Sequence, residues 1–257
     1  MKKINLGIKI SIHSFNLIPQ IYENKDKIDF IEIILLPDFT PNDLDNIKDL
    51  KIPYAIHLSN SNNGIDIGNI KYKETTHNYL EKINQNSDKI HELDPICYII
   101  HPESGDINYS ISNLKNIPLS PLALENMPLK SIHGGECLGY NPETLQEYFN
   151  DIQNLHFCFD ITHAIKAAIS LQIDYIEFIK KFLKFKNPTI FHLSGGTLDT
   201  ETDEHLPLTE SQYDLAVIKK ILLDYDAILN LTFETPKDYE KGITDDLETL
   251  NYFLNLN

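Results

Sequence analysis

Short apolar runs recur along this chain at intervals of about 30 residues, the spacing expected when eight strand–helix units are built from 257 residues. Apolar runs bounded by polar or turn-forming residues are typical of strands buried on both faces. We predict strands at residues 4–12, 29–35, 52–58, 95–101, 121–126, 155–160, 188–193 and 228–234.

The segments between these runs have helical spacing or begin with residues that favour a helix start. Proline suits the first turn because its missing N–H needs no partner there, and Thr-Glu-Ser-Gln is a capping-box pattern. The helix after Pro19 is expected to be short, and residues 102–120 to be mostly loop. Six other helices are predicted. One begins at Pro41, one spans residues 70–93, one begins at Pro142, one runs from Ala164 to Lys184 and is the longest, one runs from Thr209 to Asp224, and one spans residues 238–255.

Alternation of strand and helix along the whole chain favours an α/β fold, a parallel (β/α)8 barrel, over a doubly wound sheet. A chain of 257 residues with 42% hydrophobic composition has enough apolar side chains for one large core. Proline and glycine do not cluster into a linker. We therefore expect a single domain over residues 1–257.

Histidine and carboxylate side chains stand where most of the apolar runs end. The carboxyl ends of barrel strands meet at one rim, so side chains at these positions converge. A lone histidine there is more often part of the core or surface, but a set in the same register on neighbouring strands indicates a multinuclear metal site. The candidate ligands are His57, His101, Glu125, Asp160, His163, His192, Asp203, His205 and Glu234.

Imidazole and carboxylate ligands without cysteine suit zinc, manganese or iron. A catalytic zinc takes three protein ligands, so this set fits up to three divalent ions, and Glu125 is the natural bridge because each of its oxygens can bind a different cation. His13 ends the first strand and is either a surface residue or a substrate contact. Glu32 is either an inward polar residue or a substrate contact. The histidines expected on helix surfaces, in a turn or at the opposite rim are His77, His91, His133 and His156.

The formal net charge is −16, and every basic residue is lysine. Arginine supplies the planar fork that grips phosphates and guanine edges, so its absence removes the usual means of reading a duplex. An A·T-rich genome, with which the many Asn and Ile residues agree, explains the missing arginine without any functional cause. A strongly acidic protein nevertheless repels a polyanion unless its charge is locally inverted.

Features that would direct the chain to a membrane or out of the cell are missing from the sequence. The N-terminal MKKINLGIKISIHSF alternates apolar and polar residues, and no apolar run approaches the length of a membrane span. Cys97, Cys137 and Cys158 are odd in number and are expected to be buried thiols without a catalytic role. We expect a soluble, cytoplasmic protein, with no membrane and no protein partner implied.

Several short motifs carry a resemblance to a known family. FDITHA is similar to a DTCHA motif, HLSGG followed by DEH is similar to HLND and DRH motifs, and LENMP and FETP are similar to LEN and LETP motifs. Together they resemble the endonuclease IV branch (AP endonuclease family 2) of the xylose isomerase-like barrel superfamily. The resemblance extends from the third strand to the eighth. It implies a TIM barrel with three zinc ions that hydrolyses the phosphodiester 5′ to an abasic site in DNA.

Carried over by position, the resemblance implies three ligand sets. It also implies catalytic roles for Glu125, as the bridge, and for Glu234, which would orient or deprotonate the attacking water. Bound metal supports that chemistry by lowering the pKa of water. The first set is His57, His101 and Glu125, the second is Glu125, Asp160, His192 and Glu234, and the third is His163, Asp203 and His205.

The chain departs from the family where the family contacts DNA. Glu204 replaces an arginine between the last two ligands, and residues 206–208 replace a glycine-rich stretch. Asn60 stands in place of a tyrosine and is kept as a candidate substrate contact.

Three other functions remain open. A sugar or sugar-phosphate isomerase or epimerase would need one ion on the second ligand set, where the metal polarises a carbonyl and two glutamates move a proton. A trinuclear hydrolase of a small phosphoester would keep all three ions and have no role for DNA. A metal-binding protein without catalysis is least supported, because closed structural sites seldom lie at an open barrel rim.

Overall fold

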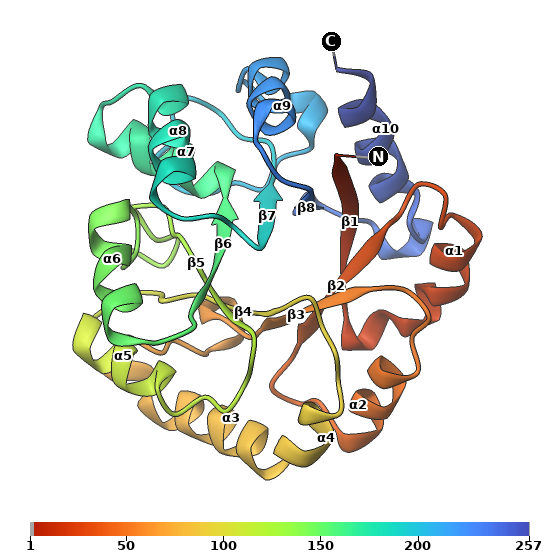
Figure 1. Cartoon of the computed structure of the whole chain (residues 1–257), viewed down its shortest axis with the longest axis vertical. Helices are drawn as coiled ribbons and strands as arrows, with labels where there is room; N and C mark the ends of the chain where they lie inside the picture. The colour runs from red at the N-terminus through yellow and green to blue at the C-terminus, as the bar shows by residue number, and fades with distance from the viewer. Residues whose placement is uncertain (1–2, 257) are drawn as a thin grey trace.

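The computed structural model describes residues 3–256, and within them eight parallel strands hydrogen-bond in chain order and close into a barrel. Each strand lies within a predicted run, so the single-domain (β/α)8 barrel is confirmed (Figure 1). The strands are β1 Ile4–Ser11, β2 Phe30–Leu35, β3 Tyr54–Leu58, β4 Tyr98–Ile100, β5 Leu122–Glu125, β6 His156–Asp160, β7 Ile190–Leu193 and β8 Leu229–Phe233.

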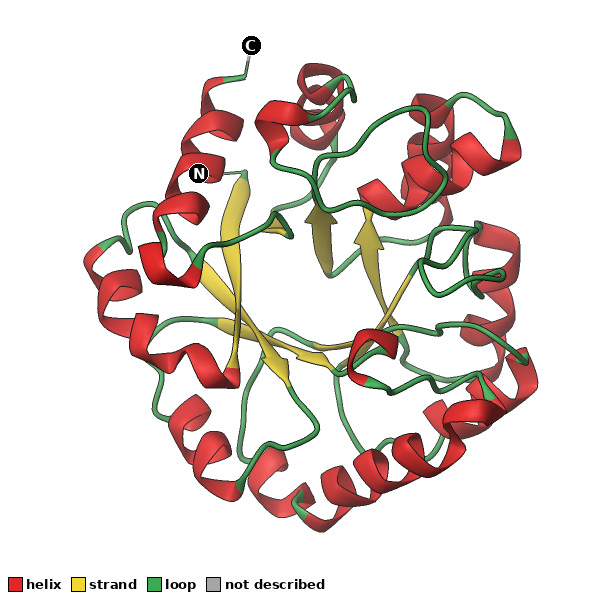
Figure 2. Ribbon diagram, turned by 180° about the vertical axis from the view of Figure 1, so that it is seen from behind, coloured by secondary structure: helices red, strands yellow, loops and turns green. Residues whose placement is uncertain are grey.

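The helices form a ring outside the strands, as Figure 2 shows. Within the described residues, the α-helices are α1 Ile18–Glu23, α2 Pro41–Lys48, α3 Lys73–Gln85, α4 Ser87–His91, α5 Ile107–Leu114, α6 Pro142–Asp151, α7 Ile161–Leu171, α8 Tyr175–Phe185, α9 Leu215–Asp224 and α10 Thr244–Asn255. Short 3-10 helices are η1 Ile12–Leu17, η2 Ser61–Asn63, η3 Ile70–Tyr72, η4 Leu208–Glu210 and η5 Tyr239–Lys241. No helix among residues 3–256 is both long and apolar enough to cross a bilayer.

Two of the predicted helices are interrupted. The helix predicted to be the longest, from Ala164 to Lys184, is divided into α7 and α8. Gln172 adopts the left-handed conformation with a φ of 57°, and Asp174 then caps a new helix. The stretch 70–93 likewise divides, with Asn86 between α3 and α4. Apolar spacing continues across both breaks, which is why the sequence pattern did not reveal them.

The predicted capping box at Thr209 is wrong. Thr209 lies inside η4, and α9 begins at Leu215 with the side chain of Asp214 accepting a hydrogen bond from the amide of Val217. Asp is as strong an N-cap as Thr, and the two signals stand five residues apart in the sequence. The tertiary path of the β7 loop decides between them.

Alternating side chains divide the apolar residues into two cores. The larger core lies between the sheet and the helices. Gly7 allows the ring of Phe30 to fill the barrel, since a Cβ at residue 7 would lie 2.3 Å from that ring. The residues of the inner core are Phe30, Ala55, Cys97, Ile99, Ala123, Cys158 and Ile190.

Polar residues continue the inward face of the seven strands β1 to β7, two positions beyond the residues that fill the barrel. Because side chains alternate with a period of two, these residues also point into the barrel, at its carboxyl rim. They are Lys9, Glu32, His57, His101, Glu125, Asp160 and His192. The fold therefore places chemistry-bearing side chains directly above an apolar floor.

Candidate metal centre

The first predicted ligand set meets on three neighbouring strand ends. His57 is the penultimate residue of β3, His101 follows β4, and Glu125 ends β5. The Nε2 atoms of His57 and His101 lie 3.4 Å and 3.1 Å from Oε2 of Glu125. Ligands around a tetrahedral zinc with bonds of about 2.1 Å are separated by roughly 3.4 Å. The spacing of these three donors therefore suits a shared cation.

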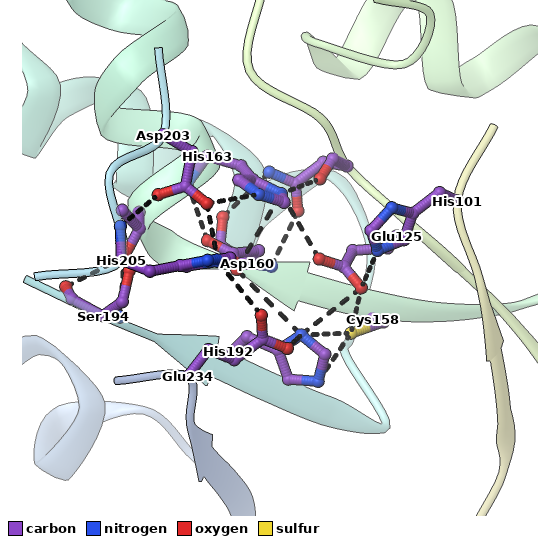
Figure 3. Close-up of polar contacts among 12 residues, drawn as sticks. His101, Glu125, Cys158, Asp160, His163, His192, Ser194, Asp203, His205 and Glu234 are labelled. Carbon is purple, nitrogen blue, oxygen red and sulfur yellow. Dashed lines mark hydrogen bonds and ion pairs between the residues drawn. The ribbon is translucent and has the colours of Figure 1, made fainter. Parts of the chain in front are cut away.

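The third predicted set is also brought together, from α7 and the loop after β7 (Figure 3). Oδ2 of Asp203 lies 3.3 Å from Nε2 of His163 and 2.7 Å from Nε2 of His205. The same nitrogen of His205 lies 3.3 Å from Oε2 of Glu234. Glu234 thus connects this set with the residues at the centre of the barrel.

The second predicted set is only partly assembled. Nδ1 of His192 lies 2.9 Å from Glu234, 3.3 Å from Glu125 and 4.0 Å from Asp160. The four side chains do not all converge on one point, however. Asp160 groups with Glu125 and His163, whereas His192 and Glu234 group with Glu32 and His57.

Hydrogen bonds orient several imidazole rings toward the cluster. Nδ1 of His57 lies 2.7 Å from the carbonyl of Leu58, and Nδ1 of His163 lies 2.8 Å from the carbonyl of Asn126. A carbonyl accepts only, so Nδ1 carries a proton in both rings and Nε2 is the nitrogen that faces the other ligands. These tautomers are the ones a metal site requires.

Unpaired buried atoms gather at this cluster. Within the described residues, buried side-chain atoms without a hydrogen-bond partner include Nε2 of His57, Oε1 of Glu125 and Oδ2 of Asp160. Burying such atoms without a partner is costly, so their concentration here indicates a missing partner of opposite charge. The residues present therefore fit divalent cations.

The charges of the cluster reinforce this conclusion. Burial alone would lower the pKa of His101, but the carboxylates of Glu125 and Glu103 outweigh it and raise the pKa to about 9. Burial opposes the same shift at His205, where Asp203 and Glu234 raise the pKa to about 10. Without metal these rings hold protons at neutral pH, so a cation must displace them in order to bind.

Two site residues escaped the sequence analysis. Lys9 of β1 forms ion pairs with Glu32, at 3.0 Å, and with Glu234. Glu103 has a φ of 60° and lies 3.2 Å from Nδ1 of His101, so it orients that ring. The alternation of Lys9 with Ile8 and Ile10 was a usable signal, because it places the lysine on the inward face. Glu103 gave no comparable signal beyond following His101 by two residues.

The three candidate substrate contacts lie in different surroundings. Oε2 of Glu32 lies 2.8 Å from Nε2 of His192, so this buried carboxylate orients a candidate ligand. His13 is exposed and pairs with Asp38 at 3.0 Å, outside the candidate metal groupings. Asn60 lines a cavity of about 290 Å³ that His57, His205 and Glu234 also line. Asn60 is therefore positioned beside the cluster, and His13 belongs to the outer surface.

The remaining histidines and cysteines lie mostly as expected. His77 and His91 are exposed on α3 and α4, His133 is exposed in the loop after β5, and His156 is exposed at the start of β6. The three cysteines are buried free thiols. Cys158 differs from expectation in its surroundings, because its Sγ contacts Oε2 of Glu125 at 3.7 Å, directly beneath the cluster.

Sequence comparisons give no relative for this chain. No family model matches it, and no curated protein matches it.

Structural comparison finds similar barrels over nearly the whole chain. Endonuclease IV from Thermus thermophilus is 19% identical, with a TM-score of 0.68 over 97% of this chain and 98% of that one. A D-tagatose 3-epimerase-like protein is 21% identical, with a TM-score of 0.61 over 96% and 98%. The 3-keto-D-glucoside 4-epimerase from E. coli is 12% identical, with a TM-score of 0.68 over 98% and 99%. These proteins are named for different reactions, so the chain shares with them a barrel fold that hosts more than one chemistry.

Proposed function

We propose that this protein is a metal-dependent phosphoester hydrolase with a trinuclear centre of the endonuclease IV type. One observation carries the proposal: the first and third ligand sets each converge within 4.8 Å at one barrel rim. An isomerase with one ion does not need these two sets. Their joint presence favours hydrolysis, in which several cations divide the charge of a phosphoryl group.

The proposed roles follow from the positions of the side chains. Metal ions at the rim would lower the pKa of water toward neutrality and stabilise the charge of the departing oxygen. Glu125 is the proposed bridge, because its Oε2 faces His57 and His101 while its other oxygen, Oε1, is buried without a hydrogen-bond partner among the described residues. Glu234 is proposed to orient or deprotonate the water, since its oxygens reach both His192 and His205. Zinc is the first candidate metal, and manganese or iron suits the same donors.

A small phosphoester is favoured over duplex DNA as the substrate. The net charge of −16 and the absence of arginine oppose binding to a polyanion. Glu204, which stands where the resembling family has arginine, forms an ion pair with the buried Lys166, so neither side chain offers a free positive charge to a phosphate backbone. Abasic DNA stays in the test as the substrate that the motifs suggest.

An isomerase or epimerase of sugars is the second candidate, and the partial second set favours it. Glu125, Asp160 and Glu234 all lie within 4.0 Å of His192, which suits a single cation bound by mixed ligands. Among the similar barrels described above, one is named a 3-keto-D-glucoside 4-epimerase and another a D-tagatose 3-epimerase-like protein.

Metal content and substrate turnover together test the proposal. We expect about three ions per chain after gentle purification, hydrolysis of bis(p-nitrophenyl) phosphate, and no isomerisation of ketoses. A duplex with a tetrahydrofuran abasic analogue, incubated with the loaded enzyme, decides the DNA question. One ion per chain with ketose isomerisation would replace the proposal by the second candidate.

Substitution of His163 distinguishes the two reactions. His163→Ala removes a ligand of the third set only, so phosphodiester hydrolysis should fall by about 100-fold or more while an isomerase would keep most of its rate. The exposed His77→Ala is the matched control and should leave turnover unchanged. Unchanged hydrolysis in the His163 variant would contradict the three-ion proposal.

A further inference from the structure

A buried lysine holds the loop that carries two of the candidate ligands. Lys166 lies on α7, one turn beyond His163, and its side chain is fully buried. A lysine is almost never fully buried unless it is paired, so this one requires a specific partner. Its ammonium group reaches the loop of residues 194–206, between β7 and η4, which contains both Asp203 and His205.

Nζ of Lys166 makes several bonds to this one loop. It donates to the carbonyl of Thr197 at 2.8 Å, to the carbonyl of Thr200 at 3.2 Å and to Oγ1 of Thr200 at 2.7 Å. It also forms an ion pair with Oε2 of Glu204 at 2.6 Å. The loop is therefore tied to α7 at three points along its length, and charge-assisted bonds of this kind are the stronger ones.

Glu204 completes the anchor from the loop side. Its Oε2 accepts a hydrogen bond from the amide of Thr197 at 2.8 Å, which closes the loop across seven residues. The bonds from Lys166 and Thr197 outweigh the effect of burial and lower the pKa of Glu204 to about 2. At the base, Gly195 and Leu206 exchange backbone hydrogen bonds of 2.9 Å.

The loop also fits closely against its surroundings at Gly196. A Cβ at that position would lie 2.0 Å from the hydroxyl of Tyr213 and 3.2 Å from Cε of Lys166. The close approach of the backbone to the Tyr213 hydroxyl therefore depends on glycine.

The anchor lies between the two ligands in sequence. Asp203 and His205 flank Glu204, and His205 has a φ of 49°, a left-handed conformation that costs a residue with a side chain. Such a conformation persists only where the surrounding structure holds it. With Glu204 drawn to Lys166, its two neighbours are presented to His163 and to each other at 3.3 Å and 2.7 Å.

We propose that Lys166 and Glu204 are positioning residues that build the third ligand set, by fixing the loop from which Asp203 and His205 reach the cluster. This inference rests on the proposed metal centre. It gives Glu204 the role of holding the loop. From its place in the sequence between two candidate ligands, Glu204 would otherwise be expected to face the substrate.

Metal counting in matched variants tests the proposal. Wild type should bind three zinc ions in competition with a fluorescent chelator. Lys166→Met and Glu204→Gln should each bind two ions with wild-type affinity, and their affinity for the third ion should be at least about 10-fold lower. Glu201→Gln, an exposed carboxylate in the same loop, is the matched control and should bind three. Because the two residues act as one unit, the double variant should be no weaker than either single variant.

A second measurement needs no metal. Exchange of the Thr197 amide with deuterium in metal-free protein should be faster in Lys166→Met and Glu204→Gln and unchanged in Glu201→Gln. If Lys166→Met does not fold, Glu204→Gln and Thr200→Val test the same bonds with smaller changes.

The outcomes separate this inference from the proposed function. Three ions at wild-type affinity in both variants would overturn the positioning role and leave the proposed function standing. Loss of all ions at once would also overturn it, since the effect would not be specific to the third set. Wild-type protein that binds fewer than three ions would overturn both proposals.

Discussion

At the scale of single residues, the cluster consists of buried carboxylates paired with imidazole rings and with one ammonium group. Six carboxylates, those of Glu32, Glu103, Glu125, Asp160, Asp203 and Glu234, lie in contact with five imidazoles and with Lys9. Burial makes each unpaired charge expensive, so every member depends on its neighbours. The effect of changing one residue is therefore predictable in sign.

Lys9→Met tests this dependence directly. The substitution leaves the buried carboxylates of Glu32 and Glu234 without their ammonium partner, so the free energy of unfolding of metal-free protein should fall by about 3–5 kcal/mol. Urea unfolding in EDTA measures it. Lys48→Met, which breaks the exposed pair with Glu92, is the control and should have little effect. An equally stable Lys9 variant would show that the two carboxylates are not charged in the metal-free protein.

The raised pKa values predict opposite pH responses with and without metal. A histidine whose pKa is raised on folding stabilises the protein fully below its unfolded pKa of about 6.5 and loses that effect as pH rises through the folded pKa. With His101 at about 9 and His205 at about 10, the metal-free protein should lose stability between pH 6.5 and 10. Zinc affinity should instead rise over this range, because protons no longer compete. Denaturant titrations at pH 7, 8.5 and 10 give the free energy of unfolding as a function of pH, with EDTA and with zinc. A free energy of unfolding that rises with pH in EDTA would contradict the pairing of His101 and His205 with their carboxylates.

At the scale of elements, strands and helices serve different purposes at the site. Most strands supply one inward polar side chain, whereas α7 supplies two in its first two turns, His163 and Lys166, which follow its N-cap residue Asp160 at intervals of three residues. This spacing places them on neighbouring parts of one helix face. α7 then ends at Leu171, where Gln172 adopts the left-handed conformation.

Glycine at this break should stabilise the protein. Gln172 is exposed and has a φ of 57°, a conformation that disfavours any residue with a Cβ. Gln172→Gly should therefore raise the free energy of unfolding by about 0.5–1 kcal/mol, measured by urea unfolding. Gln172→Ala is the control and should give no gain, since alanine keeps the Cβ. Destabilisation by glycine would mean that α7 and α8 are continuous in solution.

At the scale of the whole molecule, cations at the rim would cross-link the barrel. The candidate ligands come from β3 through the segment that follows β8, so bound metal would connect most of the closed sheet. Zinc at one hundred times its Kd should stabilise the fold by about 2.7 kcal/mol for each site that the unfolded chain lacks. Thermal unfolding with zinc, with EDTA and with magnesium as a hard-cation control measures this. A Tm that does not respond to zinc would contradict the metal centre.

Local sequence determined much of this protein. Apolar runs fixed the eight strands, because burial on both faces demands continuous hydrophobic segments, and residue types at the run ends gave the candidate ligands. Residues such as His57 and Glu125 were identifiable because their position relative to a strand end is a property of local sequence.

Only the tertiary structure decided the rest, since it depends on which distant segments meet. The pairing of Lys9 with Glu234 joins residues 225 positions apart, and the anchor of Glu204 on Lys166 spans 38. The helix break at Gln172 and the start of α9 at Asp214 depend on how loops pack, because local propensities of about 1 kcal/mol are easily outweighed by packing. The pattern of apolar and polar residues along each strand thus determines which side chains point into the barrel. Contacts between distant segments determine which charged side chains pair with one another.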